Sequence, residues 1–311
     1  MSQAQTLAPP RLRQHLDLRA VVILLACCAC WGGGQVTIKI ANAGISPVLQ
    51  AGLRSLLSGA LVFAWAMSRG IPMFERDRTF WPGVLVGALF GTEFALLYAG
   101  LNLTTASRGV VLLYSAPFVV ACGAHFLIPG DRLTMAKAIG LLAAFAGLIV
   151  AMCENLLAPG KSTFLGDIMC LVAAILWGAT TLVVRLTPLR AAPPEKTLLY
   201  QLLFSGIILV PLSPLLGEAG ITNLSLPIVF SFAYHVIAVA FVSFTAWFWL
   251  LRHYPPTRVS AFTFLVPVFG VMAGNIVLGE TFTPTLGVAL VLIATGIALV
   301  NRPVPPAMDA T

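Results

Sequence analysis

The chain contains repeated runs of about 20 mostly apolar residues, joined by short polar connections. A helix needs about 20 apolar residues to cross the hydrocarbon core of a bilayer. Strands of a membrane barrel would instead be short and would alternate apolar and polar residues. The sequence therefore predicts an all-α integral membrane protein with ten transmembrane helices. The expected helices cover residues 20–40, 47–68, 80–101, 106–128, 134–152, 164–186, 196–216, 227–251, 257–278 and 282–301.

The composition argues against a soluble or nucleic-acid-binding protein. Of the 311 residues, 59% are hydrophobic and only 9% are charged, whereas soluble domains carry roughly 25% charged residues. The net charge of +7 is scattered between the apolar runs rather than gathered on one face, so no nucleic-acid partner is expected. Cys27, Cys28 and Cys30 lack the spacing and the second ligand pair of a zinc site. We therefore expect no metal and no cofactor.

Basic residues mark one side of the predicted bundle. Fourteen of the 18 Lys and Arg residues lie in the amino-terminal segment, in the even-numbered connections and in the carboxyl tail. Lys39, Arg108 and Lys161 fall on the other side, and Arg54 lies inside a predicted helix. By the positive-inside rule, both termini are expected to be cytoplasmic.

The two halves of the chain resemble each other. Matching residues recur in order at offsets of 146 to 150 positions, and each half contains five predicted helices. Because five is odd, the second half enters the membrane upside down relative to the first, as in secondary transporters with inverted repeats. The matches are Trp31-Gly32 with Trp177-Gly178, Lys39 with Arg185, Ser58-Gly59 with Ser205-Gly206, Arg108 with Arg258, Pro117 with Pro267, and Gly130-Asp131 with Gly279-Glu280.

This repeat divides the chain into two units and places the centre of interest between them. The predicted parts are a cytoplasmic tail (1–19), a first five-helix repeat (20–152), an external linker (153–163), a second, inverted repeat (164–301) and a cytoplasmic tail (302–311). Substrates of such transporters bind near the bilayer midplane at the repeat interface. Trp31 and Trp177 both fall near mid-depth by the helical rise. They either line a central cavity or provide packing bulk.

Two ionisable residues lie inside predicted helices. Arg54 and Glu93 are each about seven or eight residues from the outer end of their helix, and such residues are functional candidates because burying charge in lipid is costly. An ion pair between them is expected, either as a structural tie or as a contact for a substrate or proton. Ser243 replaces the acid at the repeat position of Glu93. His235 is interpreted as hydrogen-bonded packing.

The candidate site residues combine aromatic walls with a few polar groups. Pro117 and Pro267 each remove a helical hydrogen bond and provide either a static kink or a hinge. The candidates for substrate binding are Trp31, Gln35, Glu93, Phe94, Tyr98, Tyr114, Trp177, Thr181, Trp247 and Asn275. The candidates for a structural or gating role are Gly32, Gly33, Arg54, Pro117, Gly178 and Pro267.

With these motifs located, the chain resembles the drug/metabolite transporter superfamily, in particular its ten-helix EamA-type members. The resemblance covers nearly the whole chain. Gly130-Asp131-Arg132 stands where the family often has Gly-Glu-Arg, and because the acid is kept we expect the turn to form. The segments that carry the resemblance are the two Trp-Gly pairs, Arg54, the stretch from Tyr98 through Thr105, Ala106 and Ser107 to Ala116-Pro117, the stretch from Pro267 to Gly279-Glu280, and the helix around Gly287–Gly296.

Within that superfamily the chain looks most like bacterial aromatic amino-acid exporters. The resemblance implies a multi-pass protein of the bacterial inner membrane whose partners are the lipid bilayer and a small-molecule substrate. The sequence contains no ATPase domain and no catalytic cluster, so a secondary transporter rather than an enzyme is expected. A broad exporter of amphipathic or cationic compounds and a membrane enzyme or scaffold are the alternatives. Transport direction, ion coupling and oligomeric state stay open, and a monomer is compatible with the sequence.

Overall fold

The computed structural model is helical throughout the part of the chain that it describes. That part comprises residues 13, 15–75, 77–103, 106–157, 164–278 and 284–302. Within it, the only extended pairing is an isolated bridge between Ile45 and Ile221. The elements of the first half are α1 (Leu18–Asn42), α2 (Pro47–Ser68), α3 (Phe80–Leu103), α4 (Ala106–Leu113), α5 (Ala116–Leu127) and α6 (Met135–Leu157). Those of the second half are α7 (Phe164–Leu186), η1 (Pro188–Arg190), α8 (Pro194–Leu215), α9 (Leu226–Tyr234), η2 (His235–Ser243), α10 (Phe244–His253), α11 (Pro256–Ala261), η3 (Phe262–Phe264), α12 (Leu265–Leu278) and α13 (Pro284–Val300).

Several of these helices have the length and composition of membrane spans. Five are long and apolar enough to cross a bilayer, and four further apolar stretches are shorter within the described residues. The five are Pro47–Ser68, Phe80–Leu97, Phe164–Leu186, Pro194–Leu215 and Leu226–His253. Large apolar side chains of these spans, such as Trp81 and Phe230, are exposed on the outside of the bundle, as is Phe126 on one of the shorter stretches. Lipid tails are the solvent that suits such a surface.

Three of the predicted continuous helices are interrupted. The helix expected over 106–128 divides into α4 and α5, with α4 ending at Leu113, four residues before Pro117. The helix expected over 257–278 contains the short 3-10 turn η3, which includes Thr263, four residues before Pro267. Both breaks fall where proline removes the amide partner of a carbonyl. The helix expected over 227–251 contains nine residues of π-helix, His235–Ser243.

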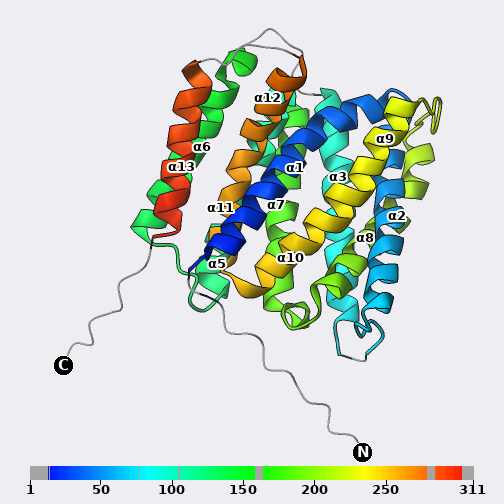
Figure 1. Ribbon diagram of the computed structural model, residues 1–311, viewed down its shortest axis with the longest axis horizontal. Helices are drawn as coiled ribbons and strands as arrows, with labels where there is room; N and C mark the ends of the chain where they lie inside the picture. The colour runs from blue at the N-terminus through cyan, green and yellow to red at the C-terminus, as the bar shows by residue number, and fades with distance from the viewer. Residues whose placement is uncertain are drawn as a thin grey trace, which may run out of the picture.

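Helix packing follows one pattern in both halves (Figure 1). α2 packs on α8 and α6 packs on α13, so each of these four helices contacts the helix at the matching position of the other half. α3 packs on α7, and in the same way α9 and η2 pack on α1. α1 packs on α12, while α7 packs on α4 and α5. The blue start of α1 and the red end of α13 lie at the same end of the bundle.

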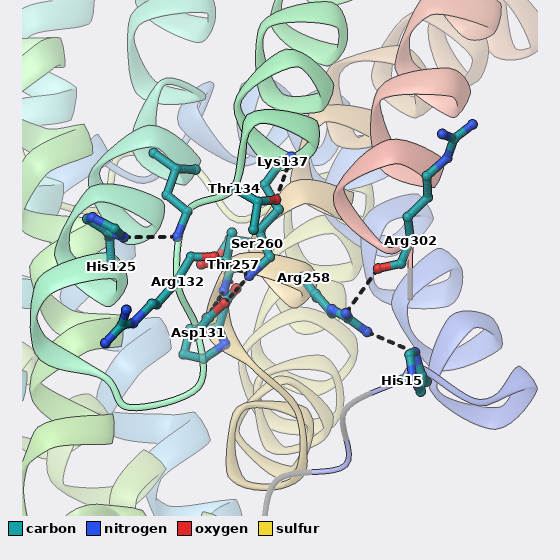
Figure 2. A network of polar contacts seen from close by, with 12 residues as sticks. His15, His125, Asp131, Arg132, Thr134, Lys137, Thr257, Arg258, Ser260 and Arg302 are labelled. Carbon is teal, nitrogen blue, oxygen red and sulfur yellow. Dashed lines mark hydrogen bonds and ion pairs between the residues drawn. The ribbon is translucent and has the colours of Figure 1, made fainter. Parts of the chain in front are cut away.

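Polar contacts tie the connections together at that end (Figure 2). Both carboxylate oxygens of Asp131 are used, because Lys137 Nζ donates to Oδ1 at 2.6 Å and the amide of Thr257 donates to Oδ2 at 3.1 Å. Asp131 is fully buried, and Gly130 before it has a φ of 87°, so the expected turn forms. Arg258 contacts His15 and the carbonyl of Arg302, which brings the two ends of the chain together.

Several sequence expectations fall outside the described residues. They concern the outermost parts of both tails, most of the 153–163 linker, and the Gly279-Glu280 echo. The side chains of Lys39, Arg108 and Lys161 also lie outside the described part, as do Thr105 and the side chains of Ala106 and Ser107. α6 extends to Leu157, five residues beyond the helix end predicted at 152.

Candidate functional site

Helices from both halves of the chain line a large, partly open cavity. Its volume is about 190 Å³, many times the roughly 10–15 Å³ that one bound water needs. The lining side chains come from both halves of the chain, from α1, α2, α3, α4, α7, α8, η2 and α10. Aromatic rings form a large part of the wall, together with aliphatic side chains and a few polar and charged groups. A cavity of this kind suits a small organic molecule.

Most of the substrate-binding candidates come together around this cavity. The ones that line it are Trp31, Glu93, Phe94, Tyr114, Trp177, Thr181 and Trp247. Arg54, predicted as a structural or gating residue, lines the cavity as well. The side chains of Gln35, Tyr98 and Asn275 lie outside the described residues.

The two repeat-related tryptophans occupy comparable aromatic settings. The indole Nε1 of Trp31 donates a hydrogen bond of 2.7 Å to Ser243 Oγ, and the ring meets the edge of Trp247 with centroids 5.2 Å apart. Trp177 makes the same type of edge contact with Tyr114 at 5.6 Å. Edge-to-face pairs of this kind hold rings in fixed orientations. The cavity walls are therefore preorganised on both sides.

Charged and polar groups interrupt the aromatic wall. Glu93 is only 5% exposed, and its Oε2 receives no hydrogen bond from the described residues. Gln201 Oε1 is likewise buried without a donor in that part of the chain. The guanidinium of Arg54 lies over the ring of Phe94, 4.6 Å from its centroid. The ion pair expected between Arg54 and Glu93 is not among those that the described residues form, although both charges face the same cavity.

His235 is held by the neighbouring helix. Its Nε2 lies 3.0 Å from the carbonyl of Gly34 and 2.9 Å from Thr37 Oγ1, both on α1. The side chain is 3% exposed and forms part of the cavity wall. This agrees with the interpretation of His235 as a hydrogen-bonded packing residue.

The candidate glycines differ in what surrounds them. A Cβ at Gly32 would lie 2.7 Å from the backbone nitrogen of Gly270 and from Phe269 Cβ, so α1 and α12 cross in close contact there. A Cβ at Gly178 would lie 2.7 Å from Val119 on α5. A Cβ at Gly33 would meet only Tyr234 Oη, at 3.6 Å. Small residues allow such close approach of membrane helices. Gly32 and Gly178 are needed for this reason, whereas the surroundings of Gly33 leave room for a larger residue.

Sequence reasoning missed several cavity residues. Gln201 carries a signal that would have found it, because it follows Arg54 by 147 positions, the offset that relates Ser58 to Ser205. Phe90, Phe244 and Phe248 also line the cavity. The chain contains 19 phenylalanines, and nothing in the sequence distinguishes these three from the rest.

Comparison with known proteins places the chain among transporters. It is 27% identical to the uncharacterized transporter YvbV of Bacillus subtilis (strain 168), over 94% of this chain and 92% of that protein. It is 26% identical to a protein of Salmonella typhimurium (strain LT2) named as a probable amino-acid metabolite efflux pump, over 86% of this chain and 89% of that protein. A solved crystal structure shares the fold with a TM-score of 0.78 at 20% identity, covering 91% of this chain and 96% of that one.

A sequence model of the EamA-like transporter family matches residues 18–153 and 164–302, which together make up most of the chain. This match and the transporter relatives agree with the apolar helices of the structure, which indicate a multi-pass membrane protein. They identify a transporter rather than an enzyme. The chain therefore belongs to the EamA-like transporter family.

Proposed function

We propose that this protein is a secondary transporter that exports amino acids, favouring those with aromatic side chains, by alternating access around the central cavity. One observation carries the proposal: the same aromatic-walled cavity presents both a carboxylate, Glu93, and a guanidinium, Arg54. An amino acid is a zwitterion, so its ammonium group matches Glu93 and its carboxylate matches Arg54. The tryptophans provide flat apolar walls for a ring.

The arrangement of the helices supports the alternating-access part of the proposal. The recurring packing pairs, such as α3 with α7 and η2 with α1, fit ten crossings arranged as two inverted five-helix repeats. The family match over two consecutive stretches of the chain fits the same plan. Rocking of such repeats about a fixed central site exposes it to each side in turn. The placement of both termini in the cytoplasm and of the protein in a bacterial inner membrane belongs to this proposal.

The relative from Salmonella typhimurium, named as a probable amino-acid metabolite efflux pump, supports the substrate class and the direction. The direct test is counterflow in proteoliposomes loaded with unlabelled phenylalanine, tyrosine or tryptophan. Labelled amino acid in the outer medium should accumulate transiently, and protein-free liposomes should show none. Absence of counterflow with every amino acid tested would overturn the substrate assignment.

Glu93→Gln tests how the cavity recognises the substrate. Loss of a charge-assisted hydrogen bond worth about 1.5–3 kcal/mol should lower amino-acid transport at least tenfold. Glu75→Gln is the matched control, because Glu75 is an exposed acid in the α2–α3 connection. Unchanged transport by Glu93→Gln would contradict the assigned role.

A second candidate function is broad export of amphipathic cations. It is favoured by the two buried acceptor atoms that have no donor among the described residues, Glu93 Oε2 and Gln201 Oε1, which suit an ammonium group. The two functions differ in their need for a carboxylate on the substrate. Export of 2-phenylethylamine at the rate of phenylalanine would favour the cation exporter, and Glu93→Gln should then abolish it. Intact cation transport by Glu93→Gln would remove the basis of this alternative.

A further inference from the structure

The amide of Gln201 is a polar group of the central cavity that the zwitterion contacts do not use. Gln201 lies on α8, lines the cavity and is only 5% exposed. Its Oε1 receives no hydrogen bond from the described residues. The two threonines of the cavity wall do not supply one, because Thr180 and Thr181 donate to the carbonyls of Leu176 and Trp177 in their own helix. The acceptor is therefore left for the molecule that fills the cavity.

The contact of α3 with α8 fixes the level of Gln201 along the bundle. A Cβ at Gly83 would lie 2.9 Å from Tyr200 Cβ, and one at Gly87 would lie 2.9 Å from the carbonyl oxygen of Tyr200. Gln201, the next residue on α8, is therefore level with this part of α3. Glu93 follows Gly87 by six residues, which corresponds to about 9 Å of helical rise. Gln201 and Glu93 thus face one cavity at two different levels.

Arg54 shares the level of Glu93. Its guanidinium lies 4.6 Å from the ring centroid of Phe94, the residue next to Glu93. The two charged groups therefore lie at one level and the neutral amide of Gln201 at the other. In tyrosine the hydroxyl lies roughly 6–7 Å from Cα by standard bond lengths, and a hydrogen bond adds about 2.8 Å. An amino acid held by its charged groups thus reaches the second level with the far end of its ring.

Aromatic side chains occupy the space between the two levels. Phe90 lies three residues before Glu93 on α3 and lines the cavity. Its ring meets the edge of Phe244 with centroids 5.9 Å apart, and Phe244 meets Trp31 in the same way at 5.8 Å. These rings also line the cavity. They offer an apolar passage for an aromatic side chain between the charged groups and Gln201.

We propose that Gln201 determines substrate specificity by accepting a hydrogen bond from a hydroxyl at the far end of the substrate's ring, so that tyrosine is preferred over phenylalanine. This role rests on the proposed function as an exporter of aromatic amino acids. Water can satisfy Oε1 while the cavity is empty, and a substrate that fills the cavity displaces that water. The phenol of tyrosine replaces the lost hydrogen bond, whereas the ring of phenylalanine leaves the buried acceptor unpaired.

The first test needs only the purified full-length wild-type protein. Isothermal titration compares tyrosine, phenylalanine and 4-fluorophenylalanine, in which fluorine fills the position of the hydroxyl without donating a hydrogen bond. Tyrosine should bind about fivefold more tightly than either of the others, the effect of one net hydrogen bond. Equal binding of tyrosine and phenylalanine would overturn the proposal. Binding of 4-fluorophenylalanine as tight as that of tyrosine would also overturn it, because ring size would then set the preference.

The second test assigns the preference to one side chain. Gln201→Met keeps the length of the side chain and removes the amide, so it should bind all three ligands with similar affinity. Gln50→Met is the matched control, because Gln50 is also buried with an unpaired Oε1 but is not among the described residues that line the cavity. It should keep the preference for tyrosine. Unfolding midpoints near the wild-type value establish that both variants are folded, and a preference retained by folded Gln201→Met would overturn the proposal.

A pair of amines separates this role from the proposed substrate class. Tyramine and 2-phenylethylamine differ only in the ring hydroxyl, and neither carries a carboxylate. If no amino acid binds, but tyramine binds more tightly than 2-phenylethylamine and loses that advantage in Gln201→Met, the amino-acid assignment is wrong and the role of Gln201 stands. If the hydroxyl brings no advantage in either series of ligands, the role of Gln201 is overturned, whatever counterflow with amino acids shows.

Discussion

The indole nitrogen of Trp31 donates a hydrogen bond of 2.7 Å to the hydroxyl of Ser243, a residue at the repeat position of Glu93. The same polar position on the two repeats thus does different things. In the second half it orients a tryptophan of the cavity wall, and in the first it places a carboxylate in the cavity. The two walls are thereby chemically different, as the proposed zwitterionic substrate requires if its two ends are to be distinguished.

Ser243→Ala should loosen the Trp31 ring. Removal of a neutral hydrogen bond typically costs about 1 kcal/mol, so we expect a lower free energy of unfolding and a several-fold higher KM for transport. Ser205→Ala is the matched control, because Ser205 is also buried but donates only to Leu202 in its own helix. In a Trp31→Phe background, where the indole donor is gone, Ser243→Ala should have little further effect. Full additivity of the two changes would contradict the assigned coupling.

The crossing of α1 and α12 gives a sharp contrast between adjacent glycines. Gly32→Ala would place a Cβ 2.7 Å from the backbone of Gly270, and overpacking of this kind typically costs about 1–3 kcal/mol. Gly33→Ala meets only Tyr234 Oη at 3.6 Å, an ordinary contact. We therefore expect a clearly lower unfolding midpoint in detergent for Gly32→Ala and a nearly unchanged one for Gly33→Ala. Equal destabilisation by both would contradict a close crossing at Gly32 as the cause of the cost, because alanine favours a helix over glycine at either position.

The helix positions and part of the cavity wall were accessible from the sequence, because both follow from local features. A run of apolar residues fixes where a helix lies, and the helical rise fixes the depth of Trp31 or Glu93 along it. Depth does not fix the direction in which a side chain points around the helix. The described residues accordingly show no direct Arg54–Glu93 salt bridge: both residues face one cavity, but the Arg54 guanidinium lies over the ring of Phe94.

The π-helix His235–Ser243 could not be predicted, since its nine residues contain neither proline nor glycine. Its two terminal residues both contact α1: His235 lies against the carbonyl of Gly34, and Ser243 accepts from Trp31. A wider turn of helix changes the angular spacing of side chains and lets both ends face the same neighbour. The cause therefore lies in tertiary contacts, which the local sequence does not contain.

Asp131 is the buried link between the α5–α6 turn and the start of α11 (Figure 2). Asp131→Asn would leave the ammonium group of Lys137, which is 6% exposed, without its anion. Breaking a buried pair by removing one partner typically costs about 3–5 kcal/mol, so we expect a large drop in the unfolding midpoint. Arg132→Gln at the next, exposed position should change it little. Similar midpoints for the two variants would contradict a structural role for the pair.

The connection between α2 and α3 should respond to acid through Asp77. Partial burial raises the pKa of the Asp77 carboxyl, but hydrogen bonds from Thr79 and from Lys196 outweigh it, and the pKa lies below its ordinary value. A carboxyl whose folded pKa is depressed stabilises the fold above its unfolded pKa of about 3.9 and loses that contribution as pH falls through the folded value. The unfolding midpoint should therefore fall between about pH 5 and pH 3, and less steeply in Asp77→Asn. At neutral pH that variant should be less stable than Asp77→Asn/Lys196→Met, because the single change leaves the buried Lys196 ammonium, 2.9 Å from Asp77 in the wild type, without its anion. An identical pH profile for wild type and Asp77→Asn would show that other acids govern this range.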